Sequence, residues 1–322
     1  MDEPFVSVVM SVYNGAAHLD ATIRSILEQK GVRFEFVIVD DGSTDASGAI
    51  LQRHAAADSR IVLLRQENSG LTRALIRACE IARGRYIARQ DAGDRSFPGR
   101  LAKQAAYLDA YPDVRLVSCW TRYMGPADEE LWMEIREDTP AQATARLRAN
   151  SREELRGISS HSSAMFRRAD YVQAGGYRSQ FWLAQDLDLW TRLTDFGQVA
   201  FVPDCLCEYR FEPHAISGRY ARKQAALTDL IIRMRKRRAA GIEEASLLEQ
   251  AAGICLDAKE HVSRSASNGL YFLGKVLMDR GDCRGMAYLR QVLAHDPFHL
   301  RVRCWLGWYA LVAMFHRRKH EC

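Results

Sequence analysis

The segment FEFVIVDDGSTDASGAILQRHAAA, residues 34–57, decides the fold class of this chain. Its first part, Phe34–Val39, is mostly apolar and rich in β-branched and aromatic residues, which predicts a buried strand. A polar turn at Asp40–Asp45 follows, and the apolar spacing of Ser47–Ala57 predicts a helix. A buried strand, a polar turn and a helix in this order make up half of a βαβ unit.

The same pattern recurs on both sides of that segment. Upstream, Phe5–Tyr13 predicts a buried strand and His18–Gln29 a helix. Downstream, strands are predicted at Arg60–Leu64 and Arg85–Ala88, with a helix at Leu71–Arg83 between them. Strands that alternate with helices of about 10–15 residues indicate an α/β protein with a parallel sheet and helices on both faces.

Polar side chains gather where three of these strands end. The clusters are Ser11–Asn14, Asp40–Asp45 and Asp91–Asp94. In an open parallel sheet, ligands bind beyond the carboxyl ends of the strands. The sequence therefore predicts a ligand site that these three clusters share.

The aspartates in the clusters allow both ligand-binding and structural interpretations. One of Asp40 and Asp41 is expected to bind a ligand, because adjacent carboxylates repel each other. Asp45 is expected to cap the helix that follows. Asp91 and Asp94 flank two small residues, which lets a phosphate or a divalent cation approach the backbone, although Asp94 could instead cap the next helix.

Charge and length divide the chain into two expected parts. From residue 216 onward there are 19 Lys and Arg against 10 Asp and Glu, whereas the remainder has 26 against 30. We expect a catalytic domain at residues 1–217 and a basic, helical extension at residues 218–322. Residues 269–300 read as helix, Gly-Asp turn and helix, which is similar to one tetratricopeptide (TPR-like) hairpin.

Cysteine usage and hydropathy bear on the compartment. The eight cysteines include no CxxC pair and no spacing suited to zinc, which favours a reducing, cytoplasmic compartment. The N-terminus lacks the basic segment of a signal peptide. The longest apolar run, Trp305–Phe315, is shorter than the ~20 residues that span a bilayer. This apolar run and the basic run Arg233–Arg238 together predict that the tail contacts the inner membrane surface or a protein partner. The alternative is that the tail is a packed helical bundle with a solvated surface.

Seven segments, in this order, resemble family-two glycosyltransferases of the GT-A fold. They are SVVMSVYNG (7–15), FVIVDDGSTD (36–45), ENSGLTRAL (67–75), GRYIARQDAGDRSFPGRLAKQ (84–104), HSSAMFRR (161–168), GGYR (175–178) and AQDLDLWTRL (184–193). The resemblance covers roughly residues 5–217 and implies a Rossmann-like sheet and inversion at the anomeric carbon by a single displacement. It also implies a nucleoside-diphosphate sugar as donor, a saccharide or lipid-linked saccharide as acceptor, and no nucleic-acid partner.

The resemblance assigns donor-binding roles to Ser11, Tyr13, Asp41, Asn68, Gly70 and Asp91. Asp91 would open the motif that holds the diphosphate through Mn²⁺ or Mg²⁺, with Asp94 as a further metal ligand. Gly93 stands where the family usually has a metal-binding aspartate. Either Asp94 takes the place of that ligand, or Asp91 and the donor phosphates hold the ion by themselves.

The same resemblance makes Asp186 the general base that takes the proton of the acceptor hydroxyl, a role typically worth about 10²–10⁴-fold in rate. Gln185 replaces the glutamate that often precedes this base. His161 and Trp190 are candidates for the acceptor side, and residues 126–150 are expected to form an irregular loop there.

Three other classes of protein compete with this interpretation. A phosphatase of the haloacid dehalogenase type needs two aspartates two residues apart, whereas Asp40 and Asp41 are adjacent. A nicotinamide oxidoreductase needs a G-x-G-x-x-G turn after its first strand, and this chain has none there. A non-catalytic nucleotide-sugar-binding or scaffold protein stays open because of Gly93 and Gln185.

Overall fold

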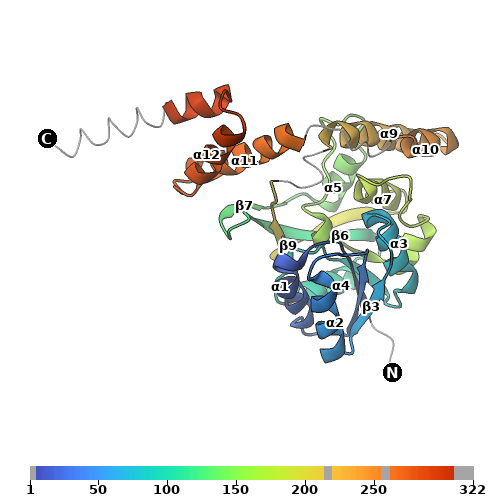
Figure 1. The fold of residues 1–322 in the computed structure, drawn as a ribbon. Coiled ribbons are helices and arrows are strands. Elements are labelled where there is room, and N and C mark those ends of the chain that lie inside the picture. Colours follow the sequence, from blue (N-terminus) through green and yellow to red (C-terminus); the bar gives the residue numbers. More distant parts are fainter. Residues whose placement is uncertain (1–4, 214–219, 255–261, 308–322) are drawn as a thin grey trace. The chain divides into compact units, whose positions relative to one another are not determined.

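The computed structural model describes residues 5–213, 220–254 and 262–307, and it divides the chain into two compact units (Figure 1). Unit 1 comprises Met1–Met124, Trp132–Arg210 and Arg222–Leu256, and unit 2 comprises Gly125–Leu131, Phe211–Ala221 and Asp257–Cys322. The expected boundary at residue 217 lies outside the described residues. The first helices of the expected extension, α9 (Ala221–Ala239) and α10 (Ala245–Ala252), fall almost wholly within unit 1.

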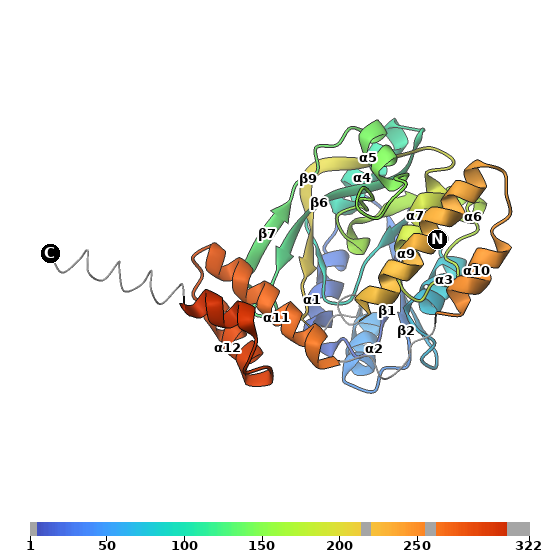
Figure 2. The same ribbon diagram turned by 90° about the horizontal axis from the view of Figure 1, so that it is seen from above.

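A mixed, nine-stranded sheet lies at the centre of unit 1 (Figures 1 and 2). Its strands are β1 (Val6–Val12), β2 (Phe34–Asp40), β3 (Ile61–Arg65), β4 (Tyr86–Arg89), β5 (Arg95–Ser96), β6 (Val114–Met124), β7 (Glu130–Glu134), β8 (Met165–Arg167) and β9 (Gln198–Arg210). The order is β3-β2-β1-β4-β8-β6-β9-β5, with β7 paired to β6. Strands β1 to β4 are mutually parallel where they pair, as the alternating pattern predicted.

Helices cover both faces of this sheet. Helices α1 (Ala16–Leu27), α2 (Ser47–Ala57) and α4 (Arg100–Ala110) bury their apolar residues against one face. Helices α3 (Leu71–Ile81), α5 (Pro140–Leu147), α6 (Arg168–Gln173) and α7 (Gln185–Leu193) do so on the other face. Every residue of β1 and β2 is buried, which is why these strands are mostly apolar.

Residues 126–150 are more regular than the sequence pattern predicted. They contain β7, which pairs with β6, and α5. Thr139 starts α5 through a capping box with Gln142, and Pro140 occupies the first turn. The prediction of an irregular loop was therefore wrong. The many charged residues hide the apolar pattern of this segment, although α5 has a favourable capping box and β7 is stabilised by pairing with β6.

Unit 2 contains the helices α11 (Val262–Asp279) and α12 (Gly285–His295), on either side of a turn at Gly281. Their apolar residues form a separate small core that includes Leu270, Leu289 and Val292. Among the residues that the structure describes, no helix has the length and apolar composition to cross a bilayer. Most of the apolar run at 305–315 and the basic residues beyond it lie outside the described residues.

Candidate active site

The parallel register brings the polar strand ends to one edge of the sheet. Val12 lies opposite Asp40, and Asp40 lies opposite Arg65. On the other side of β1, Val9 lies opposite Arg89, so the chain that follows β4 emerges at the same edge. The sequence therefore predicted the meeting of the three clusters correctly.

Asp41 shapes the turn that follows β3. Its carboxylate accepts hydrogen bonds from Gln66 Nε2 at 2.7 Å, the Ser69 N–H at 3.0 Å and the Gly70 N–H at 2.8 Å. Asp41 is only 1% exposed, so in this structure it organises the expected donor-binding turn instead of pointing freely at a ligand. The turn is one wall of an open hollow of about 610 Å³, which is lined by Gly42, Arg65, Gln66, Glu67 and Asn68.

Glycine at position 42 is required by this arrangement. Gly42 has φ of +78°, and a Cβ atom there would lie 2.8 Å from the Asn68 backbone nitrogen. A larger residue would therefore push the turn away from Asp41. Tyr13 is 53% exposed at the same edge, whereas Ser11 is buried at 9%.

Asp45 has a structural role, but the N-cap residue of α2 is Ala46 and not Asp45 as predicted. It accepts a hydrogen bond from the Ser47 N–H at 2.9 Å, in the first turn of α2, and one from the Ala16 N–H at 3.2 Å, at the start of α1. One carboxylate thus satisfies free backbone donors at two helix N-termini.

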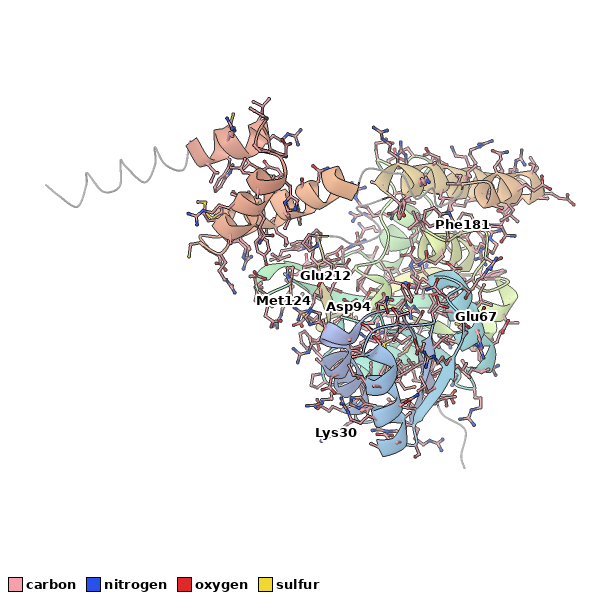
Figure 3. The ribbon with its side chains drawn as sticks, in the orientation of Figure 1. Lys30, Glu67, Asp94, Met124, Phe181 and Glu212 are labelled. Atoms are coloured by element: carbon pink, nitrogen blue, oxygen red, sulfur yellow. The ribbon has the colours of Figure 1, made fainter. Side chains whose placement is uncertain are left out.

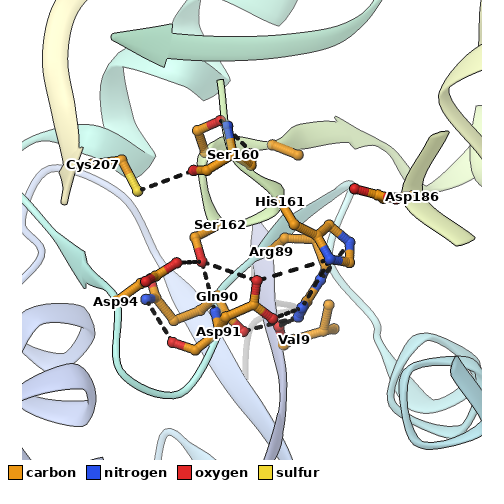
Figure 4. Close-up of polar contacts among 12 residues, drawn as sticks. Val9, Arg89, Gln90, Asp91, Asp94, Ser160, His161, Ser162, Asp186 and Cys207 are labelled. Atoms are coloured by element: carbon orange, nitrogen blue, oxygen red, sulfur yellow. Dashed lines mark hydrogen bonds and ion pairs between the residues drawn. The ribbon is translucent and has the colours of Figure 1, made fainter. Parts of the chain in front are cut away.

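Asp91 forms an ion pair with a fully buried arginine (Figure 4). Arg89, at the end of β4, is 0% exposed and donates to Asp91 Oδ1, to the Val9 carbonyl and to His161 Nε2. Burial acts to raise the pKa of Asp91, but the Arg89 guanidinium, His161 and the Ser162 hydroxyl together hold that pKa below its usual range. Asp91 is therefore a fixed, ionised carboxylate whose side chain stays partly exposed.

His161 lies between Arg89 and Tyr177. Its Nε2 accepts the Arg89 Nε–H at 3.0 Å, which leaves the ring proton on Nδ1, 3.9 Å from Asp91 Oδ2. Burial and the neighbouring guanidinium lower the pKa of His161 to about 3. The imidazole is therefore neutral near pH 7 and serves to orient Arg89 and Asp91.

Asp94 is buried and bonded on both oxygens. The Ser162 hydroxyl lies 2.5 Å from Oδ2, and the Arg210 N–H donates to Oδ1 at 2.9 Å. Burial, with the nearby Asp91 carboxylate, raises the pKa of Asp94 to about 8. Helix α4 begins after Gly99, so Asp94 does not cap it; instead it ties β4 to β9. Figure 3 shows Asp94 in the interior of unit 1 and Glu67 near its surface.

Arg89 and Arg100 are site residues that the sequence reasoning missed. Arg100 is 0% exposed and donates to the Arg89 carbonyl, to Ser96 Oγ and to Gln90 Oε1. It therefore holds the backbone at the end of β4 through the Arg89 carbonyl. The sequence did contain a signal for Arg89, because it is a charged residue at the end of an otherwise apolar strand. A charge in such a buried position is stable only when polar partners surround it.

The two acidic residues at the start of α7 have different environments. Asp188 is 0% exposed and receives hydrogen bonds from Arg178 and Arg192. Asp186 is partly exposed, and its Oδ1 accepts the Leu187 N–H at 2.8 Å. Burial raises the pKa of Asp186, and the Asp91 carboxylate contributes in the same direction. In the view of Figure 4, Asp186 lies beyond His161 as seen from Asp94.

Trp190 does not line an acceptor site. It is 1% exposed and packs in the core, edge-to-face with His161 at a ring-centroid distance of 5.7 Å. The expectation of an acceptor-side tryptophan was wrong, because position 190 faces the sheet when α7 starts at Gln185. The indole instead holds the His161 ring in place.

A divalent cation shared by Asp91 and Asp94 does not fit these residues. Both Asp94 oxygens are occupied, and Gly93 has no side chain to offer. Gly93 also has φ of +107°, a conformation that an aspartate adopts only with strain. Within residues 5–213, 220–254 and 262–307, no group of three or more His, Cys, Asp and Glu side chains could hold a metal ion. No catalytic step is therefore assigned to an ion.

Comparisons with known proteins agree with this geometry. The sequence profile described as "Glycosyl transferase family 2" matches residues 7–173. The chain is 39% identical over 107 residues, 33% of this chain and 42% of the relative, to a putative teichuronic acid biosynthesis glycosyltransferase, TuaG, of Bacillus subtilis (strain 168).

Two solved structures have a similar fold. One is S. aureus TarS 1–349 in complex with UDP-GlcNAc, with a TM-score of 0.56, 14% identity and coverage of 85% of this chain and 80% of that chain. The other is the mannosyltransferase PcManGT from Pyrobaculum calidifontis in complex with GDP-Man and Mn²⁺, with a TM-score of 0.55, 21% identity and coverage of 96% and 85%.

The mixed α/β sheet and its likeness to these solved structures show a GT-A fold. The chain belongs to glycosyl transferase family 2, and it is a glycosyltransferase.

Proposed function

We propose that this chain transfers a sugar from a nucleoside-diphosphate sugar to a hydroxyl of a saccharide or lipid-linked saccharide, with inversion at the anomeric carbon. Cell-surface polysaccharide or glycoconjugate assembly is the setting, by analogy with the relative named for teichuronic acid biosynthesis. UDP-sugars and GDP-sugars are the donor classes to consider, because the two structural neighbours hold one of each.

The contrast between Asp186 and Asp188 carries this proposal. Asp188 is fully buried and neutralised by two arginines, so it cannot take a proton from a substrate. Asp186 is partly exposed, and among the described residues no lysine or arginine forms an ion pair with it. Burial raises the pKa of Asp186 even though Arg89 acts to lower it, and a carboxylate with a raised pKa is a stronger base than an ordinary aspartate.

The remaining site residues bind and orient the donor. In this proposal the turn that Asp41 holds receives the nucleotide, a role supported by the exposure of Asn68 and Gly70 at its surface. Asp91 accepts a hydrogen bond from a donor hydroxyl in this proposal, which its ion pair with Arg89 and its partial exposure support. Asp186 then removes the proton of the acceptor hydroxyl as that oxygen attacks the anomeric carbon and the nucleoside diphosphate leaves.

Release of nucleoside diphosphate from a panel of UDP-sugars and GDP-sugars tests the function. We expect one donor to be turned over, at least by slow hydrolysis, and the matching nucleoside diphosphate to raise the melting temperature by mass action. Because Gly93 and the occupied Asp94 leave no ion-binding set, turnover should persist in EDTA and change little on addition of Mn²⁺ or Mg²⁺.

The same panel distinguishes the alternatives. Loss of turnover in EDTA, with recovery in Mn²⁺, would show that Asp91 holds an ion together with the donor phosphates. If neither UDP nor GDP changes the melting temperature at millimolar concentration, the nucleoside-diphosphate donor is wrong. Binding without any turnover would support the non-catalytic nucleotide-sugar-binding protein.

Peripheral membrane contact or a protein partner through the helical tail stays a prediction. In unit 1, Arg235 binds Asn150, Arg237 binds Ser246 and Arg238 binds Glu244, so part of the basic run serves the fold itself. Any attraction to anionic lipid should therefore be weak and should decrease as salt rises. Co-sedimentation with anionic vesicles at low salt measures this attraction. If the protein stays in the supernatant, the membrane contact is excluded, and binding to a protein partner or simple packing of the tail helices remains.

A further inference from the structure

A buried network of charges surrounds the first turn of α7, two residues from the proposed base. Asp188 accepts hydrogen bonds from Arg178 Nε at 3.0 Å and from Arg192 Nη2 at 2.6 Å. Arg178 and Arg192 are 14% and 5% exposed, and Asp188 is fully buried. Charged groups at this depth are stable only when their partners are held in place, so the geometry of this turn depends on both arginines.

The network continues into helices that lie outside the segment matched by the family profile. Arg178 Nη1 donates to Glu244 Oε2 at 2.9 Å, and Glu244 sits at the start of α10. Glu244 Oε1 also accepts from Arg238, near the end of α9, at 2.5 Å. Arg238 Nε donates to Asp195 Oδ2 at 2.6 Å, just beyond the end of α7. The α9–α10 hairpin therefore contacts α7 near both of its ends: through Arg178 at the first turn, and through Asp195 just beyond the last turn.

The network holds three cations and three anions. The cations are Arg178, Arg192 and Arg238, and the anions are Asp188, Glu244 and Asp195. Equal numbers leave no net charge to attract a phosphate or another ligand. The arrangement therefore fits a positioning role better than a second anion-binding site.

The backbone before the proposed base also needs such support. Ala184, which precedes α7, has φ of +54°, in the left-handed region that a residue other than glycine seldom adopts. The loop between Arg178 and Ala184 is fixed at its far side by Trp182, whose Nε1 donates to the Ile254 carbonyl after α10 at 2.5 Å. Strained backbone persists only where the surrounding structure determines it. Here the residues that flank α10, Glu244 and Ile254, supply two of the determining contacts.

We propose that the α9–α10 hairpin is a positioning element of the active site, in which Glu244, through Arg178 and Asp188, sets the orientation of Asp186. The proposal rests on the assignment of Asp186 as the base. Glu244 does not touch substrate; it acts on the rate by holding the helix start from which Asp186 projects. Misplacement of a reacting group by a change outside the site can cost up to about 10²-fold in rate.

The test is a double-mutant cycle in the full-length chain. Glu244→Ala and the isosteric Glu244→Gln are each made in the wild type and in Asp186→Asn. Hydrolysis of UDP-GlcNAc and of GDP-mannose gives kcat and KM, calorimetry with UDP and GDP gives nucleotide affinity, and thermal melting gives stability. Asp229→Asn is the matched control, because Asp229 joins the same helix α9 to Arg152 through an exposed ion pair that does not reach α7.

We expect Glu244→Ala to lower kcat by roughly 10- to 100-fold with KM and nucleotide affinity nearly unchanged, and Glu244→Gln to retain part of the lost rate. In the Asp186→Asn background neither change should lower kcat further, although the drop in melting temperature should be the same as in the wild type. Asp229→Asn should leave kcat unchanged.

The contrary results separate the two claims. If Asp186→Asn loses turnover but Glu244→Ala does not, or if Glu244→Ala costs the same factor in both backgrounds, the positioning role is wrong and the base assignment stands. If Asp186→Asn retains near-normal turnover, the base assignment fails first and the positioning proposal fails with it.

Discussion

Replacing Asp186 by asparagine should lower turnover by roughly 10²–10⁴-fold while nucleotide binding and melting temperature stay close to those of the wild type. Asparagine keeps the size of the side chain and can still accept the Leu187 N–H, so the start of α7 is preserved. It cannot take a proton from the acceptor hydroxyl. Nucleotide release kinetics and calorimetry with UDP and GDP provide the measurement.

The pH profile gives this prediction a second readout. Burial raises the pKa of Asp186, so the wild-type rate should fall on the acid side at a pH above the value of about 3.9 that is usual for aspartate. That acid limb should be absent from the residual activity of Asp186→Asn. Near-normal turnover in the variant would remove Asp186 from the mechanism.

Replacing Asp188 by alanine should destabilise the fold by about 3–5 kcal/mol, because two buried arginines would lose their shared carboxylate. Arg178 would keep Glu244, but Arg192 would remain at 5% exposure without its ion pair. Urea unfolding and thermal melting measure the loss. Asp229→Asn, which opens an exposed pair, should change stability by no more than about 1 kcal/mol.

The contribution of Asp188 has a defined pH dependence. Burial would raise its pKa, but Arg192 and Arg178 together hold the pKa below its usual range in the folded state. A lowered folded-state pKa gives stability that is present above the unfolded-state value of about 3.9 and is lost as pH falls through the folded value. The gap in stability between wild type and Asp188→Ala should therefore be constant near neutral pH and narrow only below about pH 4. A gap that is small at pH 7 would mean that water or other groups replace the carboxylate.

Local patterns were sufficient for the strands and helices that bury one continuous face. β1 and β2 are mostly apolar and α1 to α3 have helical apolar spacing, so their boundaries agree with prediction to within a few residues. β9 was not predicted, since its 13 residues include polar side chains that are buried only because β6 and β5 pair with it. Partners distant in sequence decided that strand, and no local signal carries such information.

The sequence by itself determined the α/β class, the sharing of one sheet edge by Ser11–Asn14, Asp40–Asp45 and Asp91–Asp94, and the choice of Asp186 as candidate base. Alternation of strand and helix fixes the class and the shared edge, because parallel strands must end at the same edge. The choice of Asp186 came from the resemblance of residues 184–193 to the family. Only the tertiary structure decided that Asp41 holds a turn, that Asp91 is bound to Arg89, and that α9 and α10 belong with the sheet. Each of these depends on side chains brought together from distant parts of the chain, and burial gives a carboxylate its role only once its partners are in place.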